Sequence, residues 1–345
     1  MFTRSPALQI DSPYLLFLGD APDQLAAKTA AGVARWRPDK CLGQLRLEGC
    51  QADLGLPDLT LEQAAAKGVK TLIVGVANRG GVISDSWKET LLKAVRLGMD
   101  IASGLHKRIG DITELREAAV ALDRQIFDVR HPVQDFSVAS GEKRPGLRAL
   151  AVGTDCSIGK MFTALALEAE LQQRGRKASF RATGQTGIFI AGEGVSVDAV
   201  IADFISGATE WLCPPNDADH WDIVEGQGSL FHPSFAGVSM GLLHGAQPDA
   251  LILCHEPDRK SMRGLKDRPL PPIDVCMALN EQCARMVNPD AQTIGFAVNT
   301  SAMTEDQARG YLDSLSQTHG LPAVDPVRTG VGPLVDRMEA VWHHA

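Results

Sequence analysis

Gly153-Thr-Asp-Cys-Ser-Ile-Gly-Lys160 matches the G-x-x-x-x-G-K core of a phosphate-binding loop. The apolar run at residues 147–152 predicts a strand before it, and the pattern at residues 160–173 predicts a helix after it. In this context backbone N–H groups and the start of a helix surround a phosphate, while Lys160 supplies positive charge. The stretch therefore predicts a P-loop, with an ordinary glycine-rich turn as the alternative.

Met161 follows this core directly, at the position where a nucleotide-hydrolysing P-loop carries a serine or threonine for Mg²⁺. The loop is thus expected to bind a phosphate without the usual metal ligand. No His/Cys cluster has the spacing of a zinc site, so no metal is expected. The residues expected to contact a phosphate-bearing cofactor are Gly153, Thr154, Cys156, Ser157, Ile158, Gly159, Lys160 and Met161.

The composition is that of a globular protein with room for two cores. The chain has 345 residues, of which 44% are hydrophobic. Its net charge of −8 argues against a general nucleic-acid or membrane-surface binder. The seven cysteines form no C-x-x-C pair, and no apolar stretch approaches the roughly 18 residues of a membrane span. We therefore expect reduced thiols, a cytoplasmic protein and no membrane contact.

Strands and helices alternate along the chain in two halves. In the first half the pattern predicts strands at 14–19, 71–76, 99–102 and 125–129, and helices at 24–35, 84–97 and 112–122. In the second it predicts strands at 147–152, 177–182, 222–225, 250–254 and 292–298, and helices at 160–173, 197–205, 273–286 and 304–318. Such alternation indicates an α/β protein with parallel sheets. A polar stretch at 139–146 indicates a linker between domains 1–141 and 142–345.

Polar loops follow several of these predicted strands. Ligands of open parallel sheets bind at the carboxyl ends of the strands, so the loops should converge. Thr183-Gly-Gln-Thr-Gly187 offers donors for a carboxylate, carbonyl or phosphate, or is a tight turn. Asp222 and Glu225 precede Gly226-Gln-Gly228. One of these acids can hold Mg²⁺ or act as a general base, and the alternative is a capping or solvated carboxylate.

Three further motifs carry histidine or arginine. His232 lies in Ser229-Leu-Phe-His-Pro233, where a structural role competes with catalysis. Arg259 follows His255 and Glu256 and can grip a substrate carboxylate or form a surface ion pair. Arg79 follows a strand and can reach a cleft between the domains or lie in a plain turn.

In this order along nearly the whole chain, the motifs resemble a P-loop family long described as a domain of unknown function. The shared stretches include Gly153–Met161, Val76-Ala-Asn-Arg-Gly-Gly81, Ala102-Ser-Gly-Leu-His106, Ala182-Thr-Gly-Gln-Thr-Gly187, Glu225-Gly-Gln-Gly-Ser-Leu-Phe-His-Pro233 and Leu253-Cys-His-Glu-Pro257. The resemblance implies a Rossmann-like N-terminal domain and a P-loop NTPase-like C-terminal domain. It also implies the activity of one member, a D-glutamate N-acetyltransferase that uses acetyl-CoA and acts with an N-acetyl-D-glutamate racemase in D-glutamate catabolism.

Under this hypothesis the P-loop holds a phosphate of acetyl-CoA without Mg²⁺. The substrate ammonium must lose a proton before it attacks the thioester, and the candidate bases are Glu225, His232 and Asp155, in that order. Candidates for holding the amino acid and the oxyanion are Arg79, Arg181, Thr183, Gln185, Thr186, Gln227 and Arg259. A homo-oligomer is also expected, with the apolar stretch 235–243 as a possible interface.

Two alternatives stay open on the sequence. Gly153-Thr-Asp155 and Glu225-Gly-Gln-Gly228 are also similar to dethiobiotin synthetase, an ATP-dependent carboxylase. That likeness implies a ligase or kinase, with Lys160 on the phosphates and with Glu225 and Asp155 on Mg²⁺. The other alternative is a non-catalytic nucleotide-sensing protein. Nothing in the spacing of the residues distinguishes D-glutamate from L-glutamate.

Overall fold

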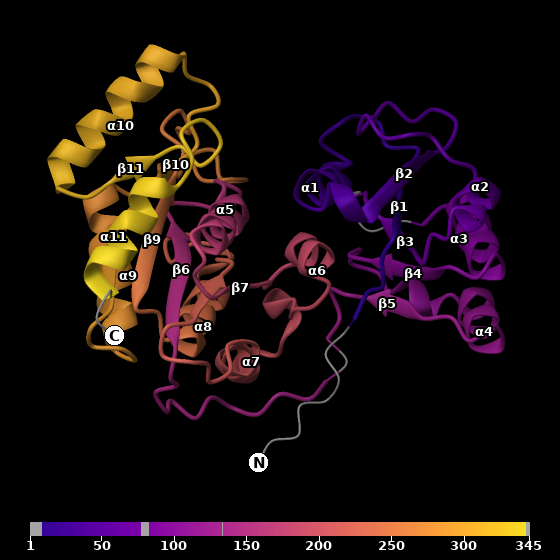
Figure 1. Cartoon of the computed structure of the whole chain (residues 1–345), viewed down its shortest axis with the longest axis horizontal. Coiled ribbons are helices and arrows are strands. Elements are labelled where there is room, and N and C mark those ends of the chain that lie inside the picture. Colours follow the sequence, from indigo (N-terminus) through magenta and orange to yellow (C-terminus); the bar gives the residue numbers. More distant parts are fainter. Residues whose placement is uncertain (1–8, 77–82, 133, 343–345) are drawn as a thin grey trace. The chain divides into compact units, whose positions relative to one another are not determined.

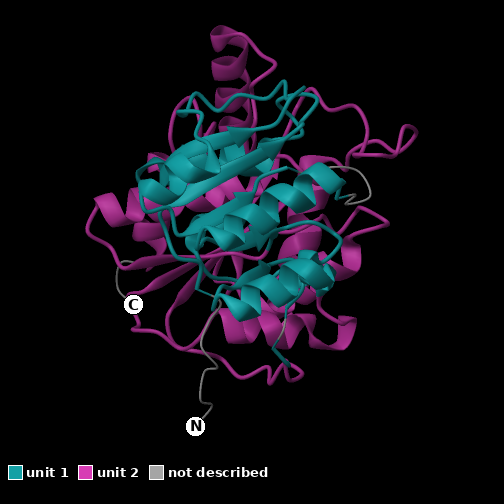
Figure 2. Cartoon of the chain, turned by 90° about the vertical axis from the view of Figure 1, so that its right-hand side faces the viewer, with its two compact units in different colours: residues 1–135, 184–199 teal, residues 136–183, 200–345 magenta. Residues whose placement is uncertain are grey.

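A computed structural model describes residues 9–76, 83–132 and 134–342 (Figure 1). The chain forms two compact units, one of residues 1–135 with 184–199 and one of residues 136–183 with 200–345 (Figure 2). Each unit contains one parallel sheet, as the alternating pattern predicts. The units differ from the expected split after residue 141 in two respects. The first boundary falls after Asp135, and Gly184–Ala199 packs with the N-terminal residues.

The sheet of unit 1 has five parallel strands in the order β2-β1-β3-β4-β5. These are β1 (Tyr14–Gly19), β2 (Cys41–Arg46), β3 (Thr71–Val74), β4 (Asp100–Ser103) and β5 (Ile126–Asp128). The helices are α1 (Lys28–Trp36), α2 (Leu61–Ala66), α3 (Asp85–Arg96), α4 (Thr113–Ala121) and α6 (Gln185–Ala191). Every residue of β1 is buried, as expected for a parallel strand covered on both faces.

The sheet of unit 2 has six parallel strands in the order β11-β10-β9-β6-β8-β7. These are β6 (Leu147–Gly153), β7 (Ala178–Arg181), β8 (Trp221–Val224), β9 (Ala250–His255), β10 (Gln292–Val298) and β11 (Ala323–Val324). The helices are α5 (Lys160–Gln173), α7 (Ile205–Leu212), α8 (Ala236–Ala246), α9 (Ile273–Arg285), α10 (Glu305–His319) and α11 (Gly332–Trp342). Strand β6 pairs with β8 on one side and β9 on the other, so the segments that follow these three strands leave the same edge of the sheet.

Helices α7 and α8 differ from the sequence-based expectation. Residues 197–205 were expected to form one helix, but they form two 3-10 turns, Val197–Ala199 and Ala202–Phe204, before α7 begins. The expected loop at 235–243 is mostly helix α8, whose Leu242 and Leu243 are buried. Glycines obscured the helix in the sequence, because they have low helix propensity. They also permit close packing, since a Cβ on Gly245 would lie 2.2 Å from the Ser206 carbonyl oxygen.

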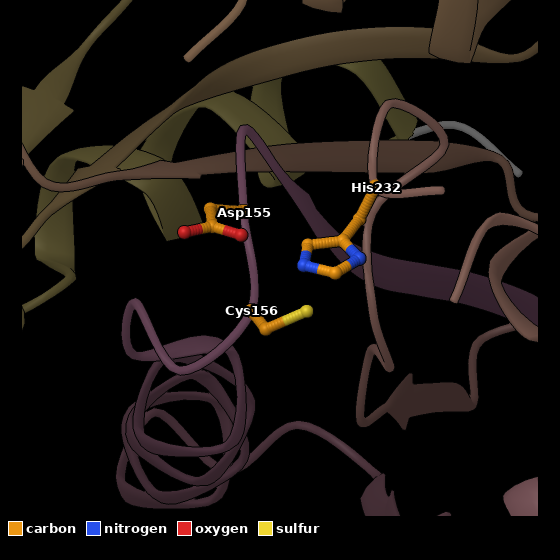
Figure 3. Close-up of side chains that lie close together, drawn as sticks. All are labelled: Asp155, Cys156 and His232. Atoms are coloured by element: carbon orange, nitrogen blue, oxygen red, sulfur yellow. The ribbon is translucent and has the colours of Figure 1, made fainter. Parts of the chain in front are cut away.

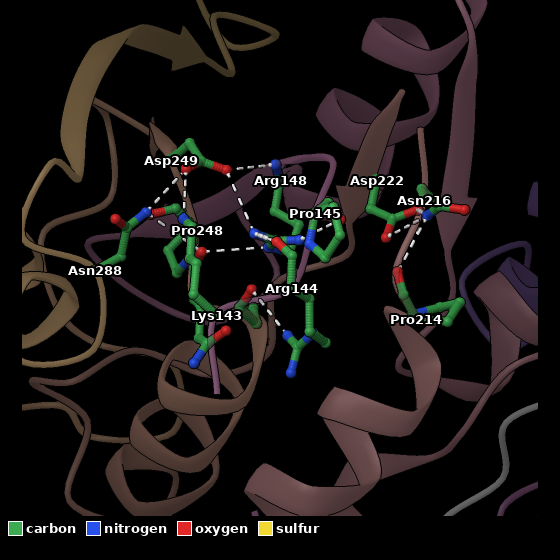
Figure 4. Close-up of polar contacts among 12 residues, drawn as sticks. Lys143, Arg144, Pro145, Arg148, Pro214, Asn216, Asp222, Pro248, Asp249 and Asn288 are labelled. Carbon is green, nitrogen blue, oxygen red and sulfur yellow. Dashed lines mark hydrogen bonds and ion pairs between the residues drawn. The ribbon is translucent and has the colours of Figure 1, made fainter. Parts of the chain in front are cut away.

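A buried polar network fixes the amino-terminal end of β6, opposite the P-loop (Figure 4). Arg148 is fully buried, and its backbone N–H donates to Asp249 Oδ2 at 2.8 Å. The Arg148 guanidinium donates to the carbonyl oxygens of Arg144 and Gln247. Asn288 donates to the other carboxylate oxygen of Asp249 at 2.9 Å. These partners satisfy the buried charges, as such groups require.

All seven cysteines are free thiols. Within the described ranges, none of the helices combines the length and the apolar character needed to cross a bilayer.

Candidate active site

The loop after β6 has the backbone of a phosphate cradle. Ser157 and Gly159 have positive φ values of 54° and 103°, and α5 begins at the next residue, Lys160. Positive φ is accessible to glycine at little cost, and alternating backbone conformations of this kind are typical of loops whose N–H groups bind an anion. A Cβ on Gly153 would lie 2.6 Å from Ile158 Cδ1, so this position also requires glycine. The sequence motif therefore has the loop geometry that it predicts.

Lys160 is buried inside this loop. Its ammonium group donates a hydrogen bond of 2.7 Å to the backbone carbonyl of Asp155. Burial disfavours the charged form and lowers the pKa of Lys160. The Lys160 stem runs against Gly226, where a Cβ would lie 2.9 Å from Lys160 Cδ and 1.6 Å from the Ala151 carbonyl oxygen. Only glycine at position 226 leaves room for both the lysine and the sheet.

Asp155 is fully buried, and its two carboxylate oxygens differ. Oδ2 accepts hydrogen bonds of 2.8 Å from the Arg259 guanidinium and from the Arg263 backbone N–H. Oδ1 is buried and has no hydrogen-bond partner among the residues that the structure describes. Burial works to raise the pKa of Asp155, but the hydrogen bonds and the Arg259 charge outweigh it, so the net pKa is lowered. Asp155 is therefore an ionised carboxylate and a weak base.

Arg259 holds the P-loop from outside. Besides Asp155, its guanidinium donates to the carbonyl oxygens of Cys156 at 2.6 Å and Ser157 at 3.1 Å, and it pairs with Glu256 at 2.6 Å. Its donors are thus engaged with the loop itself. The structure places Arg259 at the site, as expected, but gives it a positioning role on the P-loop; its expected role in holding the substrate carboxylate stays a prediction.

Cys156 and His232 lie beside Asp155, and Figure 3 shows the three side chains pointing toward one another. One oxygen, sulfur or nitrogen atom of each lies within 4.8 Å of the others, a grouping that could hold a metal ion. The ring of His232 is already held on both sides, with Nε2 3.0 Å from the Arg263 carbonyl oxygen and Nδ1 accepting from the Ser234 N–H at 3.2 Å. Neither nitrogen is available as a proton acceptor in this arrangement.

Glu225 follows β8 and is buried beside the P-loop strand. Its carboxylate accepts the Thr183 N–H at 2.9 Å, and its carbonyl accepts the Thr183 hydroxyl at 2.6 Å. Gln227 donates to the same hydroxyl at 3.1 Å. The loops after β7 and β8 are therefore joined through Thr183, and three of the expected site residues come together.

His255, at the end of β9, is a member of the site that is missing from the candidate catalytic residues. Its Nδ1 lies 3.0 Å from the hydroxyl of Thr154 in the P-loop. Burial, with a smaller contribution from Arg259, lowers the pKa of His255 to about 4, so the ring is neutral at physiological pH. Its position directly after a central strand was the available sequence signal.

The remaining candidate residues have other partners, belong to unit 1 or lie outside the described ranges, apart from Met161. Arg181 is buried in the sheet and donates to Asp222 at 2.7 Å, so its guanidinium is already committed to that ion pair. Gln185 and Thr186 begin α6 in unit 1, where the Thr186 hydroxyl donates to Thr29. Arg79 lies outside the described residues. Met161 is the second residue of α5, directly after Lys160.

Comparison with known families fits this arrangement. Residues 137–335 match a model described as a "Domain of unknown function (DUF1611_C) P-loop domain", and residues 45–132 match a "Domain of unknown function (DUF1611_N) Rossmann-like domain". The chain belongs to the DUF1611 family. The order of the two models confirms the expected Rossmann-like and P-loop domains.

Two relatives of this DUF1611 chain are named D-glutamate N-acetyltransferase. The relative from Tritonibacter scottomollicae is 56% identical over 96% of this chain and its own full length. The relative from Pseudoalteromonas sp is 48% identical over 95% of this chain and 99% of its own. A crystal structure of a DUF1611 family protein from Anabaena variabilis is similar with a TM-score of 0.84 and 30% identity, over 96% of this chain and all of that one.

Proposed function

We propose that this chain is a D-glutamate N-acetyltransferase that takes its acetyl group from acetyl-CoA. Two relatives of 56% and 48% identity carry the name of this activity. The observation on the site that carries the proposal is the P-loop with buried Lys160 and with Met161 in place of the metal-binding hydroxyl. Such a loop can anchor a phosphate of CoA, whereas ATP cleavage needs a metal to neutralise charge on the transferred phosphoryl group.

The reaction needs a base for the amine of D-glutamate. The deprotonated nitrogen attacks the thioester carbonyl carbon, the carbonyl oxygen becomes an oxyanion, and collapse releases the CoA thiolate, which takes up a proton. We assign the base role to Glu225. It is buried at the strand edge next to the P-loop, whereas hydrogen bonds and Arg259 lower the pKa of Asp155 and backbone groups occupy both nitrogens of His232.

Thr183 and Gln227 are the proposed groups for orienting Glu225 and the reacting atoms. The Thr183 N–H donates to the Glu225 carboxylate, and the Gln227 amide donates to the Thr183 hydroxyl. A side-chain amide in this position can donate to the developing oxyanion.

The decisive experiment is thioester release from acetyl-CoA across a panel of D- and L-amino acids. The proposal expects release with D-glutamate and formation of N-acetyl-D-glutamate. Calorimetric titration with CoA and with ATP, each with and without Mg²⁺, distinguishes the remaining alternatives. Tight binding of ATP with Mg²⁺ and no binding of CoA would favour the ligase or kinase and overturn the transferase.

A further inference from the structure

A cavity of about 210 Å³ opens beside the P-loop, on the side of β10 and β11. One wall comes from the loop itself and the first turn of α5, through Ile158, Gly159 and Phe162. The lining also includes Pro326 and Val327 from the segment after β11. Because phosphate loop and cavity share residues, a group linked to a bound phosphate can enter the cavity directly.

We propose that this cavity binds the adenine ring of the acetyl donor. This inference rests on the proposed function, because it takes acetyl-CoA as the acetyl donor. Ligand pockets for whole drug-sized molecules measure about 300–1,000 Å³, so this smaller cavity suits one part of a ligand. The apolar side chains in the lining, among them Phe162, Pro326 and Val327, are the surroundings that a flat aromatic base requires.

Val327 supports this assignment by its exposure. It lines the cavity and is 61% exposed, which is high for a branched apolar side chain. A base in the cavity would cover it and remove apolar surface from water.

Asn299 supplies a polar group for the base. It follows β10 and lines the cavity. Its side-chain oxygen accepts the Ser301 N–H at 3.2 Å, while among the described residues no group accepts a hydrogen bond from its amide nitrogen. That nitrogen can donate to a ring nitrogen of adenine.

Asp325 selects against guanine. Guanine carries N–H donors on its ring edge that need an acceptor, for which a free carboxylate is well suited. The Asp325 carboxylate is already saturated. One oxygen accepts from the N–H and the hydroxyl of Thr300, and the other accepts from the N–H groups of Val327 and Arg328. A guanine in the cavity would find no free acceptor on Asp325 for these donors, so the site favours adenine.

The test enlarges an exposed lining residue of the cavity in the intact protein. Val327→Trp places a large ring there without adding charge, and Val138→Trp is the control, because Val138 is 64% exposed and does not line the cavity. Titration with ADP, GDP and inorganic pyrophosphate measures the base and the phosphates separately. We expect wild-type protein to bind ADP at least about tenfold more tightly than GDP or pyrophosphate. Val327→Trp should abolish this advantage and leave pyrophosphate binding unchanged, whereas Val138→Trp should behave as wild type.

Equal affinity for ADP and pyrophosphate in wild-type protein, or unchanged ADP affinity in Val327→Trp, would overturn the proposal. Kinetics separates this outcome from failure of the proposed function. If wild-type protein transfers acetyl groups and Val327→Trp has an unchanged KM for acetyl-CoA, the cavity assignment is wrong and the transferase stands. If wild-type protein binds ADP through the cavity but releases no CoA with any amino acid, the cavity stands and the transferase is wrong.

Discussion

Lys160 is the residue on which the proposed binding of a phosphate depends. Its ammonium group lies inside the loop and donates a hydrogen bond to the Asp155 carbonyl oxygen. A bound phosphate would replace this neutral carbonyl as the acceptor of the Lys160 hydrogen bond. We expect Lys160→Ala to raise the KM for acetyl-CoA at least about tenfold, because a charge-assisted hydrogen bond contributes about 1.5–3 kcal/mol. The KM for D-glutamate should change little. Steady-state kinetics with each substrate varied in turn measures both values, and Lys177→Ala, at an exposed lysine of the same unit, is the control. Equal effects on the two KM values would contradict the role of Lys160.

Glu225 is the residue expected to move the proton. Glu225→Gln keeps the shape and the acceptor for the Thr183 N–H but removes the basic carboxylate. We expect kcat to fall about 10²- to 10⁴-fold, the usual contribution of general base catalysis, with little change in thermal stability. Glu256→Gln, at an acid that pairs with Arg259, is the comparison. A kcat within a few-fold of wild type in Glu225→Gln would exclude Glu225 as the base.

The positions of single site residues could be predicted from the sequence where the backbone conformation requires a particular residue type. Gly153, Gly159 and Lys160 follow from the motif, and the structure gives them the expected positions. Side-chain partners across strands were not predictable. Arg181 pairs with Asp222 and Arg259 grips the P-loop because of distances between segments far apart in the chain. Charge and position alone cannot distinguish such arginines from substrate ligands.

The Glu225–Gly228 loop, at the scale of an element, depends on close backbone packing. We expect Gly226→Ala to destabilise the fold by about 3 kcal/mol, as overpacking of a filled site does, and to displace the loop from Lys160. Gly237→Ala in α8 is the control, because a Cβ there meets nothing within 4 Å. Chemical denaturation compares the two variants, and equal stability would show that the loop can yield.

The hydrogen bonds and the ion pair that Arg259 makes to the P-loop, including the one to Asp155, give the protein a pH-dependent stability. The pKa of Asp155 is lowered in the folded state, so its contribution is present at neutral pH and is lost as the pH falls through the folded pKa. We expect Arg259→Met to cost about 2 kcal/mol at pH 7, a value discounted for the partial exposure of the arginine. The difference from wild type should shrink below about pH 4, where the unfolded carboxyl takes up its proton. Denaturation at several pH values measures this, and a difference independent of pH would exclude the Asp155 ion pair as its cause.

Elements with strong apolar runs were predicted well, and those with glycine or weak patterns were not. Strand β10 and helix α5 have the expected bounds. Strand β2 was missed, because its sequence CLGQLR has little apolar alternation. Helix α6 was taken as a loop, because glycines precede it and lie within it.

The whole molecule has one feature that sequence order hides, namely the return of 184–199 to unit 1. A linker can be read from composition, but membership of a compact unit depends on three-dimensional packing. Helix α6 contributes buried Ile188, Phe189 and Ile190. We expect Ile190→Ala to lower the free energy of unfolding by about 2–5 kcal/mol. Ile201→Ala, at an isoleucine that is 71% exposed, should change it by less than about 0.5 kcal/mol. Chemical denaturation compares them, and a small effect of Ile190→Ala would show that α6 adds little to unit 1.

The peptide bond between Thr183 and Gly184 carries the chain from unit 2 into unit 1. Thr183 also holds Glu225 through two hydrogen bonds, one to the carboxylate and one to the carbonyl. The proposed base is thus hydrogen-bonded to the last residue of unit 2 before the chain enters unit 1. The residue at which the chain leaves unit 2 therefore also fixes the position of the proposed base, and a change of backbone conformation at Thr183 would move the carboxylate of Glu225.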